Sequence, residues 1–428
     1  MLKYKKFVPC IYLHQKNAVT SLTDTTIISM NACELARFYS DHNADEILVF
    51  DMSTEDAEHE ENLSVIKHMA ESVAVPFLGA GHVKRMEDIK KLLYAGCKKA
   101  VLDLSLESNI EIMKEVSLKF GQDKLVGAFS DLNTLSTYQE ALNEFVSELL
   151  VMEEAVLKES LSISQIPMLA MLPSISLDKM LQVMGREGIS GITGTFVNEN
   201  IKEIPTLKQL CKENGVLVNT LEPTLQWSDF KLNADGMMPI VVQDYKTNEV
   251  LMVAYMTEES YQLTLQTGKM TYYSRSRNEL WVKGDTSGHY QYVKSLTADC
   301  DLDTILAKVS QVGAACHTGH YSCFFNELVK TDDTETNPLQ VFERVSDVIK
   351  DRKLHPKEGS YTNYLFDKGI DKILKKLGEE ATEIVIAAKN PNPDEIKYEI
   401  SDFLYHMMVL MVEKDVTWEE ITQELAQR

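Results

Sequence analysis

The sequence predicts a multidomain protein with an N-terminal α/β segment, a mainly β module in the middle and an all-α segment at the C-terminus. Three observations carry this prediction. Short apolar runs alternate with amphipathic stretches up to about residue 217, and aromatic-rich strand–turn–strand patterns follow up to about residue 328. Beyond that point, apolar residues recur at three- and four-residue spacing. The 428 residues suffice for two to four domains.

Four short apolar runs of the N-terminal segment read as buried parallel strands, and the stretches between them read as helices. A glycine follows the helical stretch MEDIKKLLYAG (86–96), where a left-handed cap forms easily. Strand–helix alternation on this scale predicts a parallel α/β sheet or barrel. The predicted strands are EILVFDM (46–52), VAVPFLGAG (73–81), KKAVLDLS (98–105) and KLVGAFSD (124–131).

The middle segment contains two predicted strand–turn–strand units. IVVQDYKTNEVLMVAYM has a Lys-Thr-Asn turn between two strands, and MTYYSRSRNELWVKG forms a second unit. EESYQLTLQTG is predicted to be helical, and KTDDTETNP has the composition of a linker. The chain then continues as helices, with Asn390-Pro391-Asn392-Pro393 breaking two long ones, so a small helical bundle is expected.

Composition excludes some classes of protein. A formal net charge of −22 argues against general nucleic-acid binding, which needs a basic surface. No long uncharged apolar run predicts a membrane span, and the N-terminus lacks the pattern of a secretory signal. Seven cysteines are few and odd in number, so they indicate reduced thiols or metal ligands in a cytoplasmic protein.

The stretch ADCDLDTILAKVSQVGAACHTGHYSC (298–323) concentrates potential metal ligands. Its three cysteines are unequally spaced, which is unlike a four-thiolate zinc knot and favours a catalytic zinc with an open position. The interleaved acids are hard oxygen ligands suited to Mg²⁺, and in an extended strand they would share one side. The alternative is that the cysteines are small buried hydrophobes and the acids a solvated edge. The residues are Cys300, Cys316 and Cys323 for zinc, and Asp299, Asp301 and Asp303 for magnesium.

Two predicted C-terminal helices carry matched pairs of carboxylates. Glu380 and Glu383 share a helix face, and Glu399 and Asp402 repeat this spacing on the next helix. Four facing carboxylates on apolar helices would repel one another unless a divalent cation compensates, and Mg²⁺ bound to a pyrophosphate group fits this role. The alternative is a solvated charged stripe.

Residues 236–325 resemble phosphoribosyl-AMP cyclohydrolase through IVVQDYKTNEVLMVAYM, YYSRSRNELWVKGDTSGH, DCDLD and CHTGHYSCF. The resemblance implies that the three cysteines bind Zn²⁺ across a dimer interface and that the three aspartates bind Mg²⁺. It also implies that a zinc-bound hydroxide attacks C6 of the adenine and the N1–C6 bond breaks. His317 is the candidate for proton transfer. Candidates for binding phosphate and ribose are Arg275, Arg277, Lys283, Thr286, Ser287 and His289, while His320 has a weaker claim.

Residues 339–428 resemble phosphoribosyl-ATP pyrophosphohydrolase, an all-α family with an ExxE…ExxD pattern. The motifs are EGSYTNYLFDKGIDKILKKLGEEATEIVIAAKN and EISDFLYHMMVLM. The resemblance implies Mg²⁺ on the four carboxylates and makes Glu379 a possible base for the attacking water. Lys372, Lys375 and Lys376 are candidates for binding the polyphosphate.

The N-terminal segment resembles the (β/α)8-barrel isomerase and cyclase of histidine biosynthesis, with residues 132–158 apparently shortened. The likeness lies in FVPCIYL, LVFDMS, VAVPFLGAGHVKRMEDIKKLLYAGCKKAVLDLS and IPMLAMLPSISLDKMLQVMGREGISGITGTFV. Where that family has catalytic aspartates, this sequence has Tyr12 and Ser130, with Asp131 adjacent to the second position. LPSISLDK lacks the expected phosphate-binding glycines, although Gly79-Ala80-Gly81 keeps part of the other loop. The sequence therefore predicts a degenerate barrel without the family's proton transfers.

Together these features predict a bifunctional hydrolase of histidine biosynthesis that acts on small phosphoribosyl nucleotides as a homodimer, with the barrel in a docking or assembly role. One alternative is a general nucleotide pyrophosphohydrolase fused to a zinc module, with the barrel as a scaffold. Another is a binding or scaffold protein that has lost its chemistry. The expected boundaries are 1–220 for the barrel, 221–328 for the cyclohydrolase, 329–338 for a linker and 339–428 for the pyrophosphohydrolase.

Overall fold

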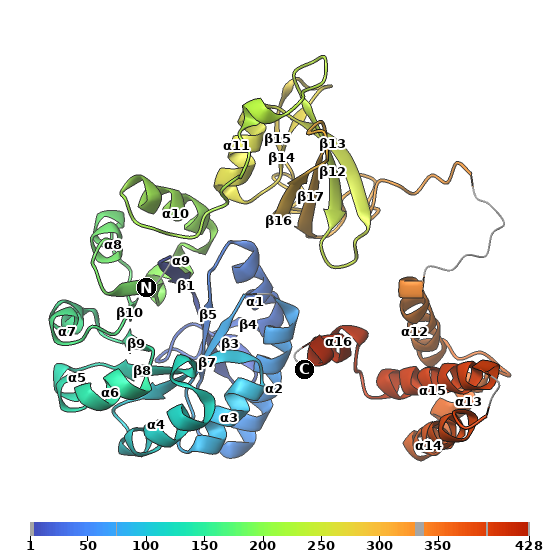
Figure 1. Ribbon diagram of the computed structural model, residues 1–428, viewed down its shortest axis with the longest axis horizontal. Coiled ribbons are helices and arrows are strands. Elements are labelled where there is room, and N and C mark those ends of the chain that lie inside the picture. Colours follow the sequence, from blue (N-terminus) through green and yellow to red (C-terminus); the bar gives the residue numbers. More distant parts are fainter. Residues whose placement is uncertain (1–3, 74, 330–337, 391–392, 427–428) are drawn as a thin grey trace. The chain divides into compact units, whose positions relative to one another are not determined.

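The computed structural model describes residues 4–73, 75–329, 338–390 and 393–426, and it divides the chain into two compact units (Figure 1). The first unit covers residues 1–327 and contains both an N-terminal α/β region and a middle module. The second unit covers residues 328–428 and is helical. In the described part of the chain, no helix combines the length and apolar character that a membrane span requires.

A parallel sheet forms the centre of the N-terminal α/β region. Its first strand run is interrupted at Pro9, which separates β1 (Lys6–Val8) from β2 (Cys10–His14). Because β1 pairs with the last strand and β2 pairs with the second strand run, the sheet curls until its two ends meet at residues 6–14. In spatial order after β2, the strands are β5 (Ile47–Asp51), β6 (Phe77–Ala80), β7 (Cys97–Asp103), β8 (Leu125–Phe129), β9 (Glu148–Val151), β10 (Met168–Met171) and β11 (Ile189–Thr193).

Helices follow the parallel strands and cover the outer face of the curled sheet (Figure 1). The four predicted strands are confirmed as β5 to β8. The stretch 132–158 retains a complete strand, β9, between short helices. The helices are α1 (Ala32–Asp41), α2 (Asp56–Ser72), α3 (Met86–Tyr94), α4 (Glu107–Phe120), α5 (Leu132–Thr137), α6 (Gln139–Phe145), α7 (Leu157–Ile163), α8 (Leu177–Met184), α9 (Thr195–Glu199) and α10 (Ile204–Glu213), with 3-10 turns η1 (Gln122–Lys124), η2 (Glu154–Val156) and η3 (Ile201–Glu203).

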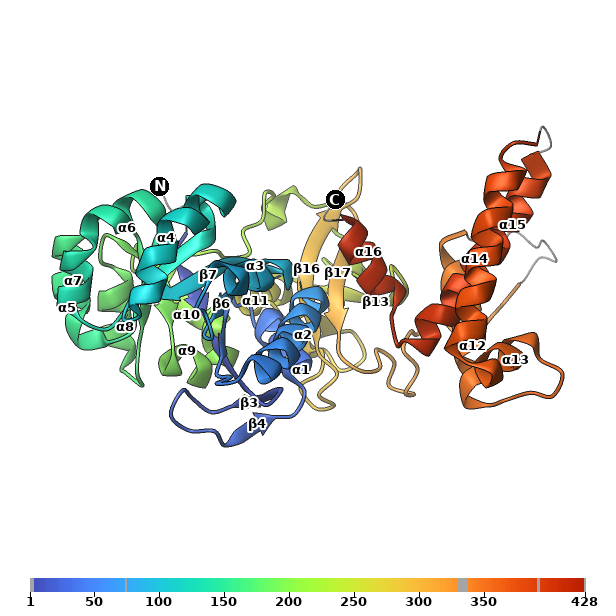
Figure 2. The same cartoon turned by 90° about the horizontal axis from the view of Figure 1, so that it is seen from below.

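A small antiparallel extension interrupts the strand–helix alternation after β2. β3 (Asn17–Val19) pairs with β2, and β4 (Ile27–Ser29) pairs with β3. Figure 2 shows both strands projecting from the body of the N-terminal region.

The amino ends of the parallel strands are joined by a buried charged network. Glu148, at the start of β9, is 1% exposed. Its carboxylate accepts hydrogen bonds from Lys6 on β1 at 2.8 Å and Lys99 on β7 at 2.7 Å, and from the Ser190 hydroxyl on β11 at 2.6 Å. Desolvation raises the pKa of Glu148, but the two ammonium groups outweigh it and lower the pKa to about 2. One ionised carboxylate therefore connects four strands.

The middle module is built on a four-stranded sheet in the order β13-β12-β17-β16. Parallel pairing of β12 with β17 places these strands at the centre, and β13 and β16 lie at opposite edges. Both predicted strand–turn–strand units and the predicted helix are confirmed. The elements are η4 (Trp227–Asp229), β12 (Met238–Asp244), β13 (Val250–Met256), α11 (Glu258–Thr267), β14 (Thr271–Ser274), β15 (Glu279–Val282), β16 (Gln291–Ala298) and β17 (Ile305–Gln311).

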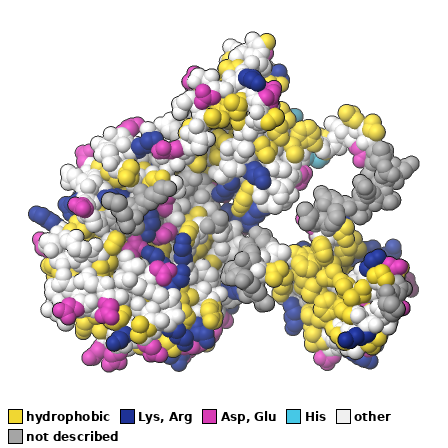
Figure 3. Space-filling model, in the orientation of Figure 1, with side chains coloured by type: hydrophobic (Ala, Val, Ile, Leu, Met, Phe, Trp, Pro, Cys, Tyr) yellow, Lys and Arg dark blue, Asp and Glu magenta, His cyan; other side chains and the backbone are white. Residues whose placement is uncertain are grey.

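In the helical unit, α14 packs closely against α15. α12 contacts α15, and α13 contacts α14. Its small core includes Ile349, Leu365, Ile373 and Val409. Hydrophobic side chains also gather on its surface (Figure 3), among them Val385 and Ile386. Most of the predicted linker, and Pro391 and Asn392 of the helix break, lie outside the described residues. The helices are α12 (Pro338–Leu354), α13 (Tyr361–Lys368), α14 (Ile370–Ala387), α15 (Pro393–Glu413) and α16 (Trp418–Ala426).

Candidate active sites

Three carboxylates converge in the tight turn between β16 and β17. Asp299, Asp301 and Asp303 each offer an oxygen within 4.8 Å of the others. The segment forms a turn and not an extended strand, so the three aspartates do not share a side through strand alternation. Leu302 has a φ of 64° in this turn, which brings the three acids together. Carboxylate oxygens at this separation suit Mg²⁺, which prefers hard ligands.

Backbone N–H groups shape this acidic turn. The Asp299 carboxylate accepts hydrogen bonds from the N–H groups of Asp303 at 3.0 Å and Thr304 at 3.2 Å. Desolvation raises the pKa of Asp299, but these hydrogen bonds together bring it below its ordinary value. The turn therefore keeps this carboxylate ionised and fixes its direction.

A second loop, residues 315–323, brings two of the three predicted zinc ligands together. The Cys316 thiol lies 3.0 Å from the Thr318 hydroxyl, and a hydrogen bond relates the Cys316 and Cys323 side chains. The Cys323 N–H donates to Leu251 O on β13 at 2.7 Å, which fixes the end of the loop. The hydrogen bond from Thr318 is the main reason that the pKa of Cys316 is lowered.

Lys283 supports the cysteine loop from beneath. It is 6% exposed, and its ammonium group donates to Ala315 O at 2.8 Å. Desolvation lowers the pKa of Lys283, and its charge in turn favours the thiolate forms of Cys316 and Cys323. Lys283 therefore lies beside the cysteine loop, and its predicted role in binding substrate stays a prediction.

Cys300 lies apart from the other two cysteines. It sits in the β16–β17 turn, whereas Cys323 is bound to β13 at the opposite edge of the sheet. Three strand spacings separate these edges by about 14 Å, and ligands of one zinc ion lie only about 2.3 Å from it. Consistent with this, the three cysteines do not form a ligand group within the described residues of one chain.

The other predicted substrate-binding residues lie on exposed turns of the middle module. The Arg275 guanidinium stacks over the Tyr255 ring at 3.9 Å, and Arg277 pairs with Glu279 at 3.3 Å. Thr286 and Ser287 are exposed between β15 and β16, and the Ser287 hydroxyl accepts from the His289 N–H. The His317 ring lies beside the cysteine loop, with Nδ1 4.0 Å from Cys316 Sγ, and His320 stacks on Phe325. Their roles toward substrate remain predictions.

The helical unit contains a second carboxylate cluster between α14 and α15. Glu380, Glu383 and Glu399 offer oxygens within 4.8 Å of one another. Asp402 lies close enough to raise the pKa values of Glu380 and Glu399, although desolvation is the larger cause for both. Glu380 and Glu399, whose charged forms are disfavoured by desolvation and by neighbouring carboxylates, lie in a site suited to a divalent cation.

The basic residues of α14 lie beside this cluster. Lys376 donates to Glu379 at 2.8 Å and lies 3.8 Å from Glu380, and Lys375 also pairs with Glu379. The hydrogen bond from Lys376 is the main reason that the pKa of Glu379 is lowered, and the role of Glu379 as a base stays a prediction. Lys372 lies over the Tyr364 ring instead of facing the carboxylates directly.

Sequence analysis missed His406, which contacts the carboxylate cluster, and Tyr361, which contacts His406. His406 Nδ1 lies 2.8 Å from Asp402 O and 3.6 Å from Glu380 Oε1, and Nε2 lies 2.9 Å from the Tyr361 hydroxyl. Because a carbonyl oxygen has no proton, the proton on Nδ1 belongs to His406, so the N–H side of the ring faces the cluster. A histidine four residues after Asp402 in a strongly apolar helix was the available sequence signal.

Among the described residues, no equivalent carboxylate cluster lies inside the curled sheet at the carboxyl ends of its parallel strands. Tyr12 stacks on Phe50 with ring centroids 5.4 Å apart, and Met52, Met152 and Met171 pack around the same interior. Asp131 is occupied elsewhere, because its carboxylate caps α5 through Thr134. Apolar side chains therefore fill the place where a barrel enzyme would carry out proton transfer.

Gly81 of the retained glycine loop packs closely against β5. Gly81 has a φ of 87°, and a Cβ at this position would overlap the Asp51 carbonyl. The glycine is thus needed both for the positive φ and for the close approach to Asp51 at the end of β5.

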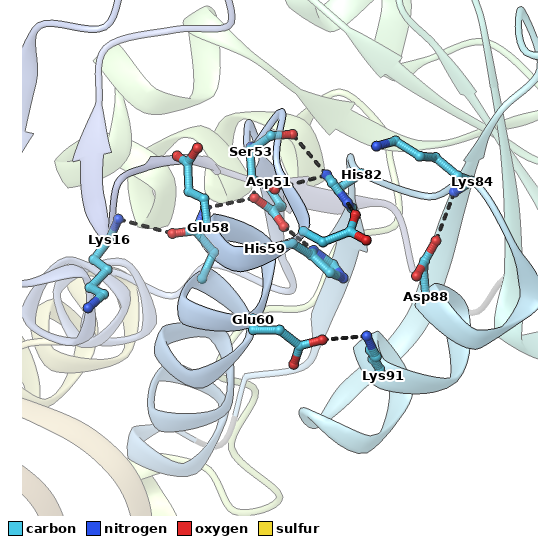
Figure 4. Close-up of polar contacts among 12 residues, drawn as sticks. Lys16, Asp51, Ser53, Glu58, His59, Glu60, His82, Lys84, Asp88 and Lys91 are labelled. Carbon is cyan, nitrogen blue, oxygen red and sulfur yellow. Dashed lines mark hydrogen bonds and ion pairs between the residues drawn. The ribbon is translucent and has the colours of Figure 1, made fainter.

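Asp51 points outward from the sheet, into a polar cluster with α2 (Figure 4). Its carboxylate contacts His59 Nδ1 at 2.5 Å and Asn62 Nδ2 at 2.7 Å. His59 stacks on His82 with centroids 4.3 Å apart, and His82 Nε2 lies 3.1 Å from Asp56. Desolvation raises the pKa of Asp51, but these donors together lower it. The cluster fastens α2 to the ends of β5 and β6.

Three family models match successive parts of the chain. The model described as "Histidine biosynthesis protein" matches residues 6–159. The phosphoribosyl-AMP cyclohydrolase model matches residues 252–325, which include the acidic turn and the cysteine loop. The phosphoribosyl-ATP pyrophosphohydrolase model matches residues 342–428, which include the carboxylate cluster of α14 and α15.

Curated relatives match about half of the chain over nearly their whole length. A histidine biosynthesis bifunctional protein HisIE from Thermoanaerobacter pseudethanolicus is 54% identical over 209 residues, 46% of this chain and 97% of the relative. The proteins of that name from Lactococcus lactis and Bacillus subtilis are 50% and 45% identical and are covered to 88% and 96% of their lengths. The chain therefore belongs to the HisIE family of bifunctional histidine biosynthesis enzymes and is a hydrolase with both a phosphoribosyl-AMP cyclohydrolase and a phosphoribosyl-ATP pyrophosphohydrolase domain.

Proposed function

We propose that the helical unit hydrolyses phosphoribosyl-ATP to phosphoribosyl-AMP and pyrophosphate, and that the middle module then adds water to C6 of the adenine and opens the N1–C6 bond. The two carboxylate clusters, one in each module, are the observation that carries this proposal. Each cluster concentrates negative charge that a divalent cation would neutralise. The second step consumes the product of the first, so the fusion raises the local concentration of the intermediate.

In the middle module, Asp299, Asp301 and Asp303 would hold Mg²⁺, and the three cysteines would hold zinc. The donor sets fit, because the acids supply hard oxygens and the cysteines supply soft sulfurs. Bound zinc would supply a water that ionises near neutral pH. His317 would accept or return the proton beside Cys316, and Arg275 and Arg277 would bind phosphate.

The zinc site would be shared between two copies of the chain. Cys316 and Cys323 are paired, whereas Cys300 lies at the other edge of the same sheet. A second copy that presents its own Cys300 to this pair would complete the set, and a two-fold dimer would form two such sites. This arrangement requires no rearrangement of the sheet.

A complementation experiment tests this arrangement. Cys300→Ala and Cys316→Ala should each abolish ring opening and zinc retention, because each variant damages both shared sites. After the two variants are unfolded and refolded together, half the dimers should be mixed and each should contain one intact site, restoring about a quarter of the activity. Recovery of zinc, measured by elemental analysis, should parallel the recovery of activity.

Two results would contradict the shared site. Either variant alone could retain zinc at the wild-type ratio, or the mixture could remain inactive although mixed dimers are demonstrated. A mixture of Cys316→Ala and Cys323→Ala serves as the matched control. These cysteines lie in one loop of one chain, so each mixed dimer has both sites damaged. This mixture should therefore recover no activity.

In the helical unit, Glu380, Glu383, Glu399 and Asp402 would hold Mg²⁺, which would neutralise the leaving pyrophosphate. Lys376 lies beside the cluster and would bind the polyphosphate, with Lys372 further along α14. Glu379 is held by two lysines and would orient the attacking water while remaining ionised.

Tyr361 and His406 should tune the metal affinity of this cluster. Tyr361→Phe removes the hydroxyl that holds the imidazole, so the N–H side of His406 is no longer fixed toward Glu380. Substitution of a residue that supports a metal ligand typically weakens metal affinity by about 10- to 100-fold. Mn²⁺ binding, measured by calorimetry, should therefore weaken by about tenfold or more. Tyr405→Phe is the control, since Tyr405 binds Thr362 across the same helices. Equal weakening by both variants would argue for a general packing effect.

We further propose that residues 1–220 form a (β/α)8-type barrel without isomerase or cyclase activity. The meeting of the sheet ends at residues 6–14 supports the barrel, and the apolar interior around Tyr12 supports the loss of proton transfer. The boundaries 221–328 and 339–428 are proposed for the two hydrolase domains.

A further inference from the structure

The last turn of α1 contacts the middle module through three consecutive residues, Asp41, His42 and Asn43, which we call the α1 corner. Asp41 and His42 are 6% and 3% exposed although they end a surface helix of the N-terminal region. All three residues contact the middle module, at residues that lie more than 200 positions later in the chain. The corner is therefore part of an interface inside the first compact unit.

Asp41 uses both carboxylate oxygens on the β16–β17 hairpin. Oδ1 lies 3.0 Å from the Lys294 ammonium on β16, and Oδ2 lies 3.4 Å from the Ser310 hydroxyl on β17. A carboxylate buried in this way is costly to leave without its partners. Removing one partner while the two parts stay in contact would therefore leave an uncompensated buried charge.

His42 makes a directed contact with the same face. Its Nδ1–H donates to Phe38 O at 2.8 Å, so in the neutral ring Nε2 accepts from the Tyr292 hydroxyl, 3.3 Å away. Desolvation lowers the pKa of His42, which favours the neutral ring. The rings also pack, with centroids 5.1 Å apart.

Asn43 fits against the glycine that ends α11. Gly268 has a φ of 69°, and a Cβ there would overlap the Asn43 side-chain amide. Glycine at position 268 therefore suits the left-handed conformation that ends α11, and it leaves room for the Asn43 amide where this side chain now lies.

The β16–β17 hairpin is shaped to receive the corner. Tyr292 is paired with Ser310 across the two strands, and the register shifts between Val293 and Ser295, which leaves Lys294 as the extra residue. A bulge of this kind redirects a side chain, and here Lys294 meets Asp41. The other end of the hairpin is the acidic turn with Cys300.

We propose that the N-terminal α/β region is a docking platform for the cyclohydrolase module, and that the α1 corner positions the β16–β17 hairpin and thereby the metal-binding turn 299–303. The contact uses Asp41, His42 and Asn43, and α10 of the N-terminal region also contacts α11 of the middle module. Asn43 lines an adjacent cavity of about 820 Å³. Two lysines of that cavity, Lys208 and Lys212, pair with Asp45 and Glu222, whereas Lys294 pairs with Asp41 of the corner. The positioning role rests on the proposed ring-opening activity, whereas the docking contact does not.

Hydrogen exchange of the full-length chain tests the docking contact. Asp41→Asn removes the negative charge from the interface, and Tyr292→Phe removes only the hydroxyl that donates a hydrogen bond to His42 Nε2. Amides of β16 and β17 should exchange at least about tenfold faster in Asp41→Asn, and faster to a smaller degree in Tyr292→Phe. The rate of ring opening should fall in both variants, while cleavage of phosphoribosyl-ATP by the helical unit should stay at the wild-type rate.

Asp88→Asn is the matched control. Asp88 is also buried, at 1% exposure, and its carboxylate accepts from the Lys84 and Arg85 N–H groups at the start of α3, away from the corner. This variant should speed exchange in α3 and leave the hairpin unchanged. Unchanged hairpin exchange in Asp41→Asn and Tyr292→Phe, or an equal change in Asp88→Asn, would overturn the docking proposal. Faster hairpin exchange with an unaltered ring-opening rate would overturn the positioning role, and a wild-type chain that cannot open the ring would refute the proposed function alone.

Discussion

Cys316→Ala should accumulate phosphoribosyl-AMP from phosphoribosyl-ATP, whereas Glu383→Gln should leave phosphoribosyl-ATP uncleaved. Cys316 belongs to the cysteine pair of the middle module, and Glu383 belongs to the carboxylate cluster of α14 and α15. Each change removes a proposed metal ligand and should lower its own step by more than about 100-fold, since even residues that only support ligands change activity by about 10- to 100-fold. Chromatography of the nucleotides over time distinguishes the two blocks.

Cys33→Ala and Glu343→Gln are suitable controls. Cys33 lies on α1 and Glu343 is exposed on α12, both outside the carboxylate and cysteine clusters, so neither change should block a step. The proposed assignment fails if Cys316→Ala converts phosphoribosyl-AMP at the wild-type rate, or if Glu383→Gln still releases pyrophosphate. Faster cleavage of ordinary nucleoside triphosphates than of phosphoribosyl-ATP would instead favour a general nucleotide pyrophosphohydrolase.

Glu148→Gln should destabilise the N-terminal α/β region by about 3 kcal/mol at neutral pH. The pKa of Glu148 is lowered from 4.5 to about 2, and a difference of this size corresponds to about 3 kcal/mol. Amides of β9 and β11 should then exchange more than about 100-fold faster when exchange follows opening of the whole region. Because the folded-state pKa is the lower one, the stabilisation is fully present above about pH 4.5 and is lost as the pH falls toward 2.

Glu46→Gln provides the comparison within the same network. Glu46 also pairs with Lys6, at 2.7 Å, but it lies at the more solvent-accessible end of the network. Its loss should cost less than about 1 kcal/mol, as is usual for ion pairs near solvent. Equal destabilisation by both variants, or a difference between wild type and Glu148→Gln that persists unchanged at pH 2, would contradict the role of Glu148.

The strands and helices were largely predictable because local patterns determine them. Apolar runs such as EILVFDM gave buried strands, and the matched spacing of Glu380 with Glu383 placed them on one helix face that the structure confirms as part of a cluster. The metal-ligand residue types could be recognised for the same reason, since their spacing within a short segment is local information.

Features that depend on long-range contacts could not be predicted. No residue near Leu302 signals its positive φ, so the acidic stretch was considered as an extended strand although it is a turn. The residues around Lys283 in the sequence do not indicate that its side chain is buried. Only the fold places its ammonium group against Ala315 O of the cysteine loop. Tyr361 likewise meets His406 because two helices pack together, which neither helix specifies alone.

The separation of Cys300 from the other two cysteines has a consequence for how the pathway responds to dilution. If sulfur atoms from two molecules complete each zinc centre, ring-opening capacity will decline with the square of chain concentration once the pairs dissociate. Pyrophosphate release does not require those thiols, so at low enzyme concentration phosphoribosyl-AMP would form faster than it is consumed and would build up in solution.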